Sequence, residues 1–91
     1  MRFPLSYDAT ISRHDFVRLL PLAVDESTFV EIDDVFQGTG WQVHLIPLPP
    51  LHIGLFRLDR HRVEVSLPGR SADEQARFMH RFTQCYQRGG G

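Results

Sequence analysis

Apolar and polar residues alternate in five stretches of the chain, and a period of two is typical of β-strands with one buried face. The predicted strands cover residues 3–11, 28–36, 41–46, 51–58 and 61–67. Residues 33–34, both aspartate, make an irregularity in the second strand. The prolines within residues 47–50 are expected to break the sheet after the third strand, because proline donates no ladder hydrogen bond. Glycines within residues 37–40 predict one hairpin turn, and residues 59–60 are expected to form another.

Two further stretches have the spacing of helices. Ser12 followed by Asp15 has the form of a capping box, and a short helix is expected to begin there and to stop at Pro21. A second helix is predicted to begin after Ser71, since Glu74 completes a full Ser-x-x-Glu capping box. The apolar residues of this second helix form one continuous stripe: Phe78, Met79, Phe82, Cys85 and Tyr86.

The predicted strand pairings agree on a single core face. A two-residue turn at residues 59–60 places Leu58 opposite His61, and pairing of Leu45 with His52 brings the preceding strand into the same register. The shared face then collects eight apolar side chains: Trp41, Val43, Leu45, Phe56, Leu58, Val63, Val65 and Leu67. We therefore predict an α+β fold, a two-layer sandwich with a mostly antiparallel sheet, the element order β-α-β-β-β-β-α, and the C-terminal amphipathic helix packed on one sheet face. The first strand can pair at either edge of the other four.

The opposite face of these strands carries four aliphatic side chains where a solvated antiparallel sheet normally has polar ones. They are Ile46, Leu51, Ile53 and Leu55. An exposed patch of this kind usually marks an association surface. A second copy of the chain or another protein is therefore expected to cover it. Two alternatives stay open, a bulge in the strand or coverage of this face by the first helix.

Composition places the chain among ordinary globular domains. It has 91 residues, 42% of them hydrophobic, and ten basic residues against eleven acidic ones. Neither a disordered chain nor the strongly basic surface of a nucleic-acid-binding protein is therefore expected. A single domain is predicted over residues 1–88, followed by a flexible glycine tail at residues 89–91. No apolar run is long enough for a bilayer, no secretory signal stands at the start, and the single cysteine suits a small bacterial-type protein of the cytoplasm.

The five histidines do not form a metal-binding pattern. No His-x-His or His-x-x-x-His pair exists and no second cysteine is present, so neither a metal nor a cofactor is expected. His52 and His61 are predicted to lie on the core face, several positions apart. His44 is expected opposite Asp33, where the carboxylate would favour the protonated imidazole and make a modest pH-responsive pair.

Arginines gather at the turn predicted between the last two strands. Arg57 and Arg62 are expected as cross-strand neighbours on the outer face. With Arg60 and His61 they would form a site for a phosphate or a carboxylate. A solvated charged face is the competing interpretation.

Catalysis has little support in the sequence. Cys85 falls on the buried stripe of the second helix, and no nucleophile elbow, phosphate loop or dinucleotide-binding motif is present. Asp33 and Asp34 are adjacent, so they would point to opposite faces of a strand. We therefore expect a non-catalytic module for protein interaction or self-association through the aliphatic patch, with a small anion-binding domain that uses the arginine hairpin as the alternative.

Overall fold

The computed structural model describes residues 5–89 of the chain, and the side chains of residues 5–87. The elements follow the predicted order β-α-β-β-β-β-α. They are β1 (Ser6–Ala9), α1 (Arg13–Val24), β2 (Val30–Ile32), β3 (Val35–Gly38), β4 (Trp41–Ile53), β5 (Phe56–Ser66) and α2 (Ala72–Gly89). Gly89 of the predicted glycine tail ends α2, whereas residues 90–91 of that tail and residues 3–4 of the first predicted strand lie outside the described residues.

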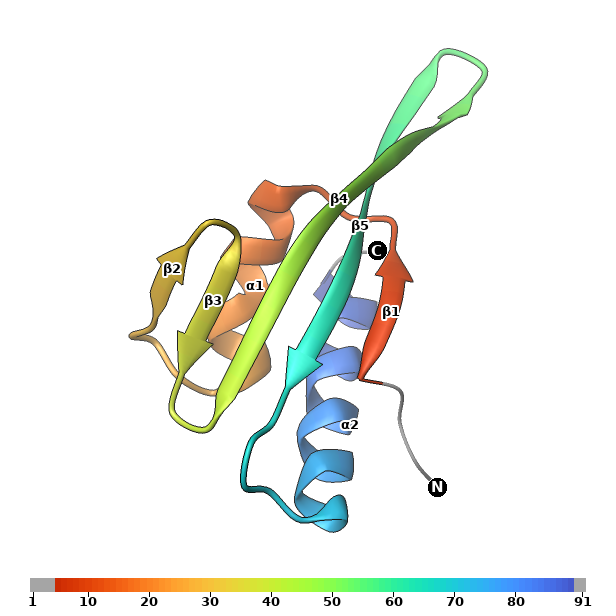
Figure 1. Cartoon of the computed structure of the whole chain (residues 1–91). Helices are drawn as coiled ribbons and strands as arrows, with labels where there is room; N and C mark the ends of the chain where they lie inside the picture. Colours follow the sequence, from red (N-terminus) through yellow and green to blue (C-terminus); the bar gives the residue numbers. More distant parts are fainter. Residues whose placement is uncertain (1–4, 90–91) are drawn as a thin grey trace.

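The five strands form one antiparallel sheet in the order β1-β5-β4-β3-β2, so the first strand takes the edge beside β5. Both helices lie on the same face of this sheet (Figure 1). The predicted α+β architecture with two layers is thus confirmed. The first helix does not cover the opposite face, because it packs beside α2 on the core side.

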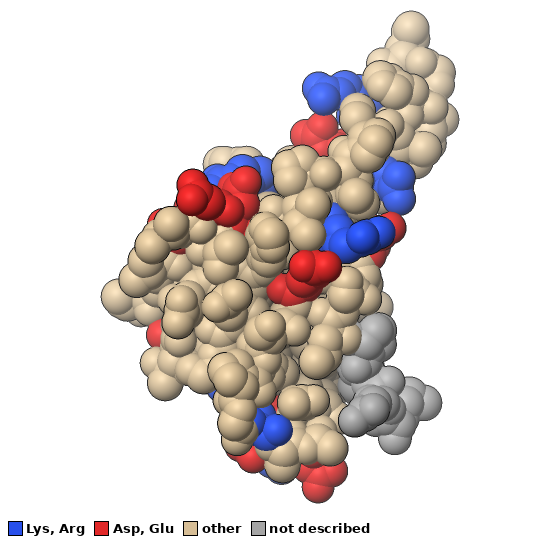
Figure 2. Space-filling model, in the orientation of Figure 1, with Lys and Arg blue, Asp and Glu red and all other residues tan. Residues whose placement is uncertain are grey.

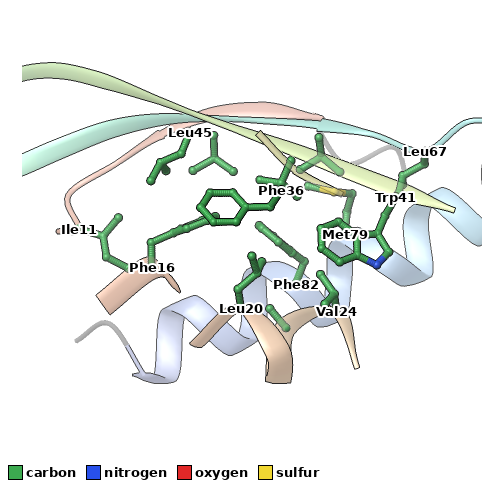
Figure 3. Packing of buried hydrophobic residues seen from close by; sticks show 14 residues of the cluster. Ile11, Phe16, Leu20, Val24, Phe36, Trp41, Leu45, Leu67, Met79 and Phe82 are labelled. Atoms are coloured by element: carbon green, nitrogen blue, oxygen red, sulfur yellow. The ribbon is translucent and has the colours of Figure 1, made fainter. Parts of the chain in front are cut away.

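The core fills the space between the sheet and the two helices (Figure 3). Phe16 and Leu20 of α1 and Phe82 of α2 are at most 1% exposed. The ring of Phe16 stacks on that of Tyr86 with centroids 4.8 Å apart, which ties the two helices together. The predicted core face is correct for six strand and loop residues, which are buried: Trp41, Val43, Leu45, Val63, Val65 and Leu67.

The two helices begin where the sequence predicts, but α1 runs further than predicted. The Ser71 hydroxyl accepts from the Glu74 amide while the Glu74 carboxylate accepts from the Ser71 amide, each over 3.2 Å, which completes the capping box of α2. The Ser12 hydroxyl caps α1. Pro21 does not stop this helix. It lies inside α1, and the helix continues to Val24 because its last turn buries apolar side chains in the core.

The predicted second strand is instead a hairpin. Residues 33–34 form a two-residue turn that joins β2 to β3. Asp33 and Asp34 have φ angles of 52° and 64°, as the type I′ turn requires at both positions. Aspartate tolerates this left-handed conformation better than most residues. The prediction of one continuous strand was therefore wrong.

The structure has two long strands where three were predicted over residues 41–46, 51–58 and 61–67. β4 continues through the prolines at positions 47, 49 and 50, and β5 runs without a break through residues 59–60. The register of the pair shifts by one residue between Leu48 and Leu51, which is a β-bulge. Pro49 and Pro50 lie in this bulge, and Pro47 pairs with His61 where no further strand of the described chain lies beside β4, so none of the three prolines ends the strand. The turn lies at residues 54–55, where Gly54 has a φ of 59°.

Candidate association surface

The hairpin of β4 and β5 extends well beyond the rest of the sheet (Figure 1). β3 pairs with β4 only as far as His44, and β1 pairs with β5 only as far as His61. Beyond these points the two strands have no partner except each other in the described part of the chain. We call this projecting segment, residues 48–60, the arm, and the remainder the body.

The bulge determines which side chains of β4 face away from the helices. Residues opposite each other on paired strands share a face, and neighbours along a strand alternate. Before the bulge, Leu45 faces the core and Ile46 faces away from it. The extra residue in the bulge reverses this alternation, so Leu51 and Ile53 also face away. Three of the four predicted patch residues thus share the outer face. The bulge, which the sequence analysis raised as an alternative to an exposed patch, is present and is what puts Leu51 and Ile53 on this face.

The outer face of the arm is apolar and exposed. Leu51 pairs with Leu58, and Ile53 pairs with Phe56. We call these four residues, together with Leu55 at the tip, the apolar arm face. Their exposed fractions are 42% for Leu51, 55% for Ile53, 103% for Leu55, 73% for Phe56 and 38% for Leu58. In Figure 2 charged atoms lie along the lower part of the arm, and none is seen at its tip.

Phe56 and Leu58 are misplaced by the sequence analysis. The predicted turn at residues 59–60 put both side chains in the core, whereas the structure puts them on the opposite face of the sheet, beyond the reach of the helices. A glycine at the first central position is the signal of a type II′ hairpin. Gly54 followed by Leu55 carries that signal, and residues 59–60 do not.

The candidate anion-binding residues do not converge. Arg57 pairs with His52 and Arg62 with Ile46, so the prediction that these two arginines are cross-strand neighbours was wrong. The Nη2 atom of Arg57 lies 3.9 Å from Oδ1 of Asp59. Arg60 and Arg62 both approach Asp8, at 3.9 and 3.1 Å.

The imidazole of His61 faces the opposite direction from Arg60 and Arg62. His61 is only 9% exposed, and its Nδ1 donates to the carbonyl oxygen of Ile11 over 2.8 Å. The four candidate side chains therefore do not surround one common site. Three of them, the arginines, already have a carboxylate neighbour.

The other titratable candidates are also dispersed. The Nδ1 atom of His44 lies 3.8 Å from Oε1 of Glu64 on the neighbouring strand β5. On β3 the residue opposite His44 is Val35, so the predicted position opposite Asp33 was wrong. His52 is exposed in the arm. The Cys85 thiol is half-buried on α2, 3.8 Å from the Leu19 carbonyl oxygen. Among the described residues, no group of three metal-ligating side chains comes together.

A small cavity opens between β1 and the end of α2. Its volume is about 270 Å³, and its apolar lining includes Ala9, Ile11 and Phe16. Tyr7 and Tyr86 also line it. Burial raises the pKa of both phenols above the ordinary value, so they stay protonated. The Tyr86 hydroxyl donates to the Phe16 carbonyl oxygen over 2.8 Å.

Comparison of the chain with protein-family models, with curated proteins and with solved structures finds no match in any of the three. No helix in the described residues combines the length and the apolar character that crossing a bilayer requires.

Proposed function

We propose that this protein is a non-catalytic self-association module, and that the arm is the surface through which one copy contacts another. The apolar arm face is the observation that supports this proposal. Five of the eight exposed large hydrophobic residues of the described chain lie on the arm. Exposed hydrophobic residues scattered singly need no explanation, but a contiguous group of this size marks a contact surface.

The exposed area is suitable for a dimer of the chain. At roughly 200 Å² for a large apolar residue, the five exposed fractions correspond to about 600 Å² on one copy. A standard interface buries about 800 Å² on each partner. A two-fold contact uses the same surface on both copies. Each arm therefore brings an exposed apolar area close to that of a standard contact, of which the partner would cover the part at the join, and the polar residues at the base of the arm would form its rim.

The experiment compares the mass of the untagged protein with that of a double variant in the arm. Phe56→Asp with Leu58→Asp places two carboxylates on the apolar arm face. The wild type is expected to be dimeric in native mass spectrometry and in sedimentation at micromolar concentration. The arm variant is expected to be monomeric, with an unchanged circular dichroism spectrum because neither side chain belongs to the core.

The matched control carries the same two changes on the edge strand of the body. Val30 and Ile32 are 59% and 66% exposed, so Val30→Asp with Ile32→Asp adds the same charge at similar exposure. This control is expected to remain dimeric. A wild type that stays monomeric at every concentration, or an arm variant that dimerises as the wild type does, would contradict the proposal.

A further inference from the structure

We infer that two copies join through the free edge of β5, so that the two arms form one four-stranded antiparallel sheet with the two-fold axis at Leu58. This inference rests on the proposed self-association and adds the strand, the register and the residues that face each other. It starts from a difference between the two edges of the arm.

The backbone of β5 presents hydrogen-bonding groups at its free edge. The Val65 amide donates to Leu5 on the β1 side. Backbone groups alternate between the two sides of a strand, so Arg57 and Asp59 also point their N–H and C=O groups to that side. In the described chain β1 ends opposite His61, so no strand pairs with these groups. An open edge of this kind is a template for a strand from another chain.

The corresponding edge of β4 has only one N–H donor among its three outward positions. The Leu45 amide donates to Asp34 on the β3 side, so the nitrogen of residue 47 points the same way. After the bulge the outward residues are 50 and 52, because Leu51 pairs toward Leu58. Two of these three outward positions, 47 and 50, are proline and have no N–H. Of the two edges of the arm, the β5 edge is therefore the one suited to strand pairing.

Charge selects the register along β5. The free segment runs from Phe56 to Arg60, and its middle residue is Leu58. A two-fold axis at Leu58 places Arg57 of each copy opposite the partner's Asp59, and both residues point their backbone groups across the join. Axes at Arg57 or at Asp59 would instead place like charges opposite each other, which destabilises a strand pair. The Leu58 side chains of the two copies then meet on the apolar side.

The same register brings the tip of one arm to the body of the other. Phe56 lies opposite the partner's Arg60, so Leu55 reaches the level of the partner's His61. In each copy Ala9 pairs with His61 and lines the apolar cavity. Leu55, which is fully exposed in one copy, therefore meets the rim of the partner's cavity.

The test exploits the reciprocal Arg57–Asp59 contact. Arg57→Asp and Asp59→Arg each replace two attractive pairs by two repulsive ones, and we expect the dissociation constant of each variant to rise roughly 30-fold. An equimolar mixture of these two variants is expected to form a heterodimer of near wild-type affinity, because both pairs across the join are then opposite in charge. The double variant with both changes is expected to recover the homodimer. Arg18→Asp, the same charge change on α1, serves as the control and is expected to dimerise as the wild type does.

The outcomes separate this inference from the proposed function. A wild-type dimer that needs Phe56 and Leu58 but is insensitive to both charge reversals would overturn the β5 register and leave self-association intact. The same holds if the mixture forms no heterodimer. A monomeric wild type would overturn both. Amide exchange slowed at residues 57 and 59 in the dimer, but not in a Leu58→Asp variant that places like charges opposite each other at the axis, is the independent readout that pairing requires.

Discussion

The strands β4 and β5 run through both the body and the arm, yet their apolar side chains have opposite surroundings in the two regions. In the body, β4 and β5 have a neighbour on each side and two helices on one face, so their core-facing side chains are buried. In the arm β4 and β5 pair only with each other. No other strand of the described chain flanks them there, and no helix covers their outer face. The pattern of apolar residues therefore does not say where the core ends.

This difference has a physical consequence for the arm. An isolated two-stranded hairpin is marginal in water, because it lacks a second layer against which to bury its side chains. The arm is continuous with strands that the body holds in register, which supports its base. A partner that covers the outer part would supply the missing layer or edge.

The largest expected effect belongs to the body. Phe82 is fully buried and contacts the rings of Phe16, Phe78 and Tyr86. Phe82→Ala is expected to lower the free energy of unfolding by about 3–5 kcal/mol, because it leaves a large cavity in the core. Ile53→Ala in the arm is expected to change it by less than about 0.5 kcal/mol.

Urea unfolding followed by circular dichroism measures both values. The Phe56→Asp/Leu58→Asp background is used for all samples, so that association does not add to the measured stability. Equal losses for the two substitutions would mean that the arm and the body are not distinct in packing.

Much of the body could be predicted from the sequence because its signals are local and agree with one another. The capping box at Ser71 and the stripe of α2 are read from neighbouring residues alone, and the alternation in residues 41–46 places Trp41 and Leu45 on the core face. A capping box and an apolar stripe are patterns of residues close together in the sequence, so both can be recognised without knowing the tertiary structure.

The arm could not be predicted as well because its geometry depends on one residue of register. Moving the turn from residues 54–55 to residues 59–60 still leaves an alternating pattern on both strands, so periodicity cannot distinguish the two hairpins. A two-residue turn at residues 59–60 would put residues 58 and 61 on the same face, whereas the continuous strand β5 puts them on opposite faces, and this is why Phe56 and Leu58 were expected in the core. Of the predicted patch, Leu51, Ile53 and Leu55 lie on the arm and Ile46 lies below it, whereas Arg57 and His61 are separated from Arg60 and Arg62 once the turn moves.

The second prediction concerns the edge asymmetry of the arm. Pro47→Val with Pro50→Val restores two outward N–H groups on β4. At about 1 kcal/mol for each net hydrogen bond, pairing along this edge would strengthen by roughly 30-fold. With both edges open, the arms can pair beyond a dimer, since such contacts do not close on themselves.

Light scattering after size-exclusion chromatography is the measurement for this variant. Species larger than those of the wild type are expected at roughly 30-fold lower concentration. Pro68→Val, in the connection between β5 and α2, is the control for loss of a proline away from any strand edge. An assembly state identical to that of the wild type would show that the prolines do not protect β4.

The smallest expected effect is a pH dependence confined to the body. The Glu26 carboxylate accepts from Trp41 Nε1 over 3.0 Å and from the Thr39 amide over 3.1 Å, and so secures the turn between β3 and β4. The hydrogen bond from Trp41, followed by that from the Thr39 amide, lowers the pKa of Glu26 below its ordinary value of 4.5. Between the folded and the unfolded pKa, the unfolded chain binds more protons, so stability falls as the pH falls.

Glu26→Gln tests this sign. The stability difference between wild type and variant is expected to be full at pH 7, where the carboxylate is ionised in both states. It is expected to shrink as the pH falls below 4.5 and through the folded pKa. Urea unfolding of both proteins at a series of pH values measures the difference. The arm variant Ile53→Ala should show no such trend, because its side chain does not titrate. A stability difference for Glu26→Gln that stays constant from pH 7 to pH 3 would mean that the charge of Glu26 contributes nothing to the free energy of unfolding.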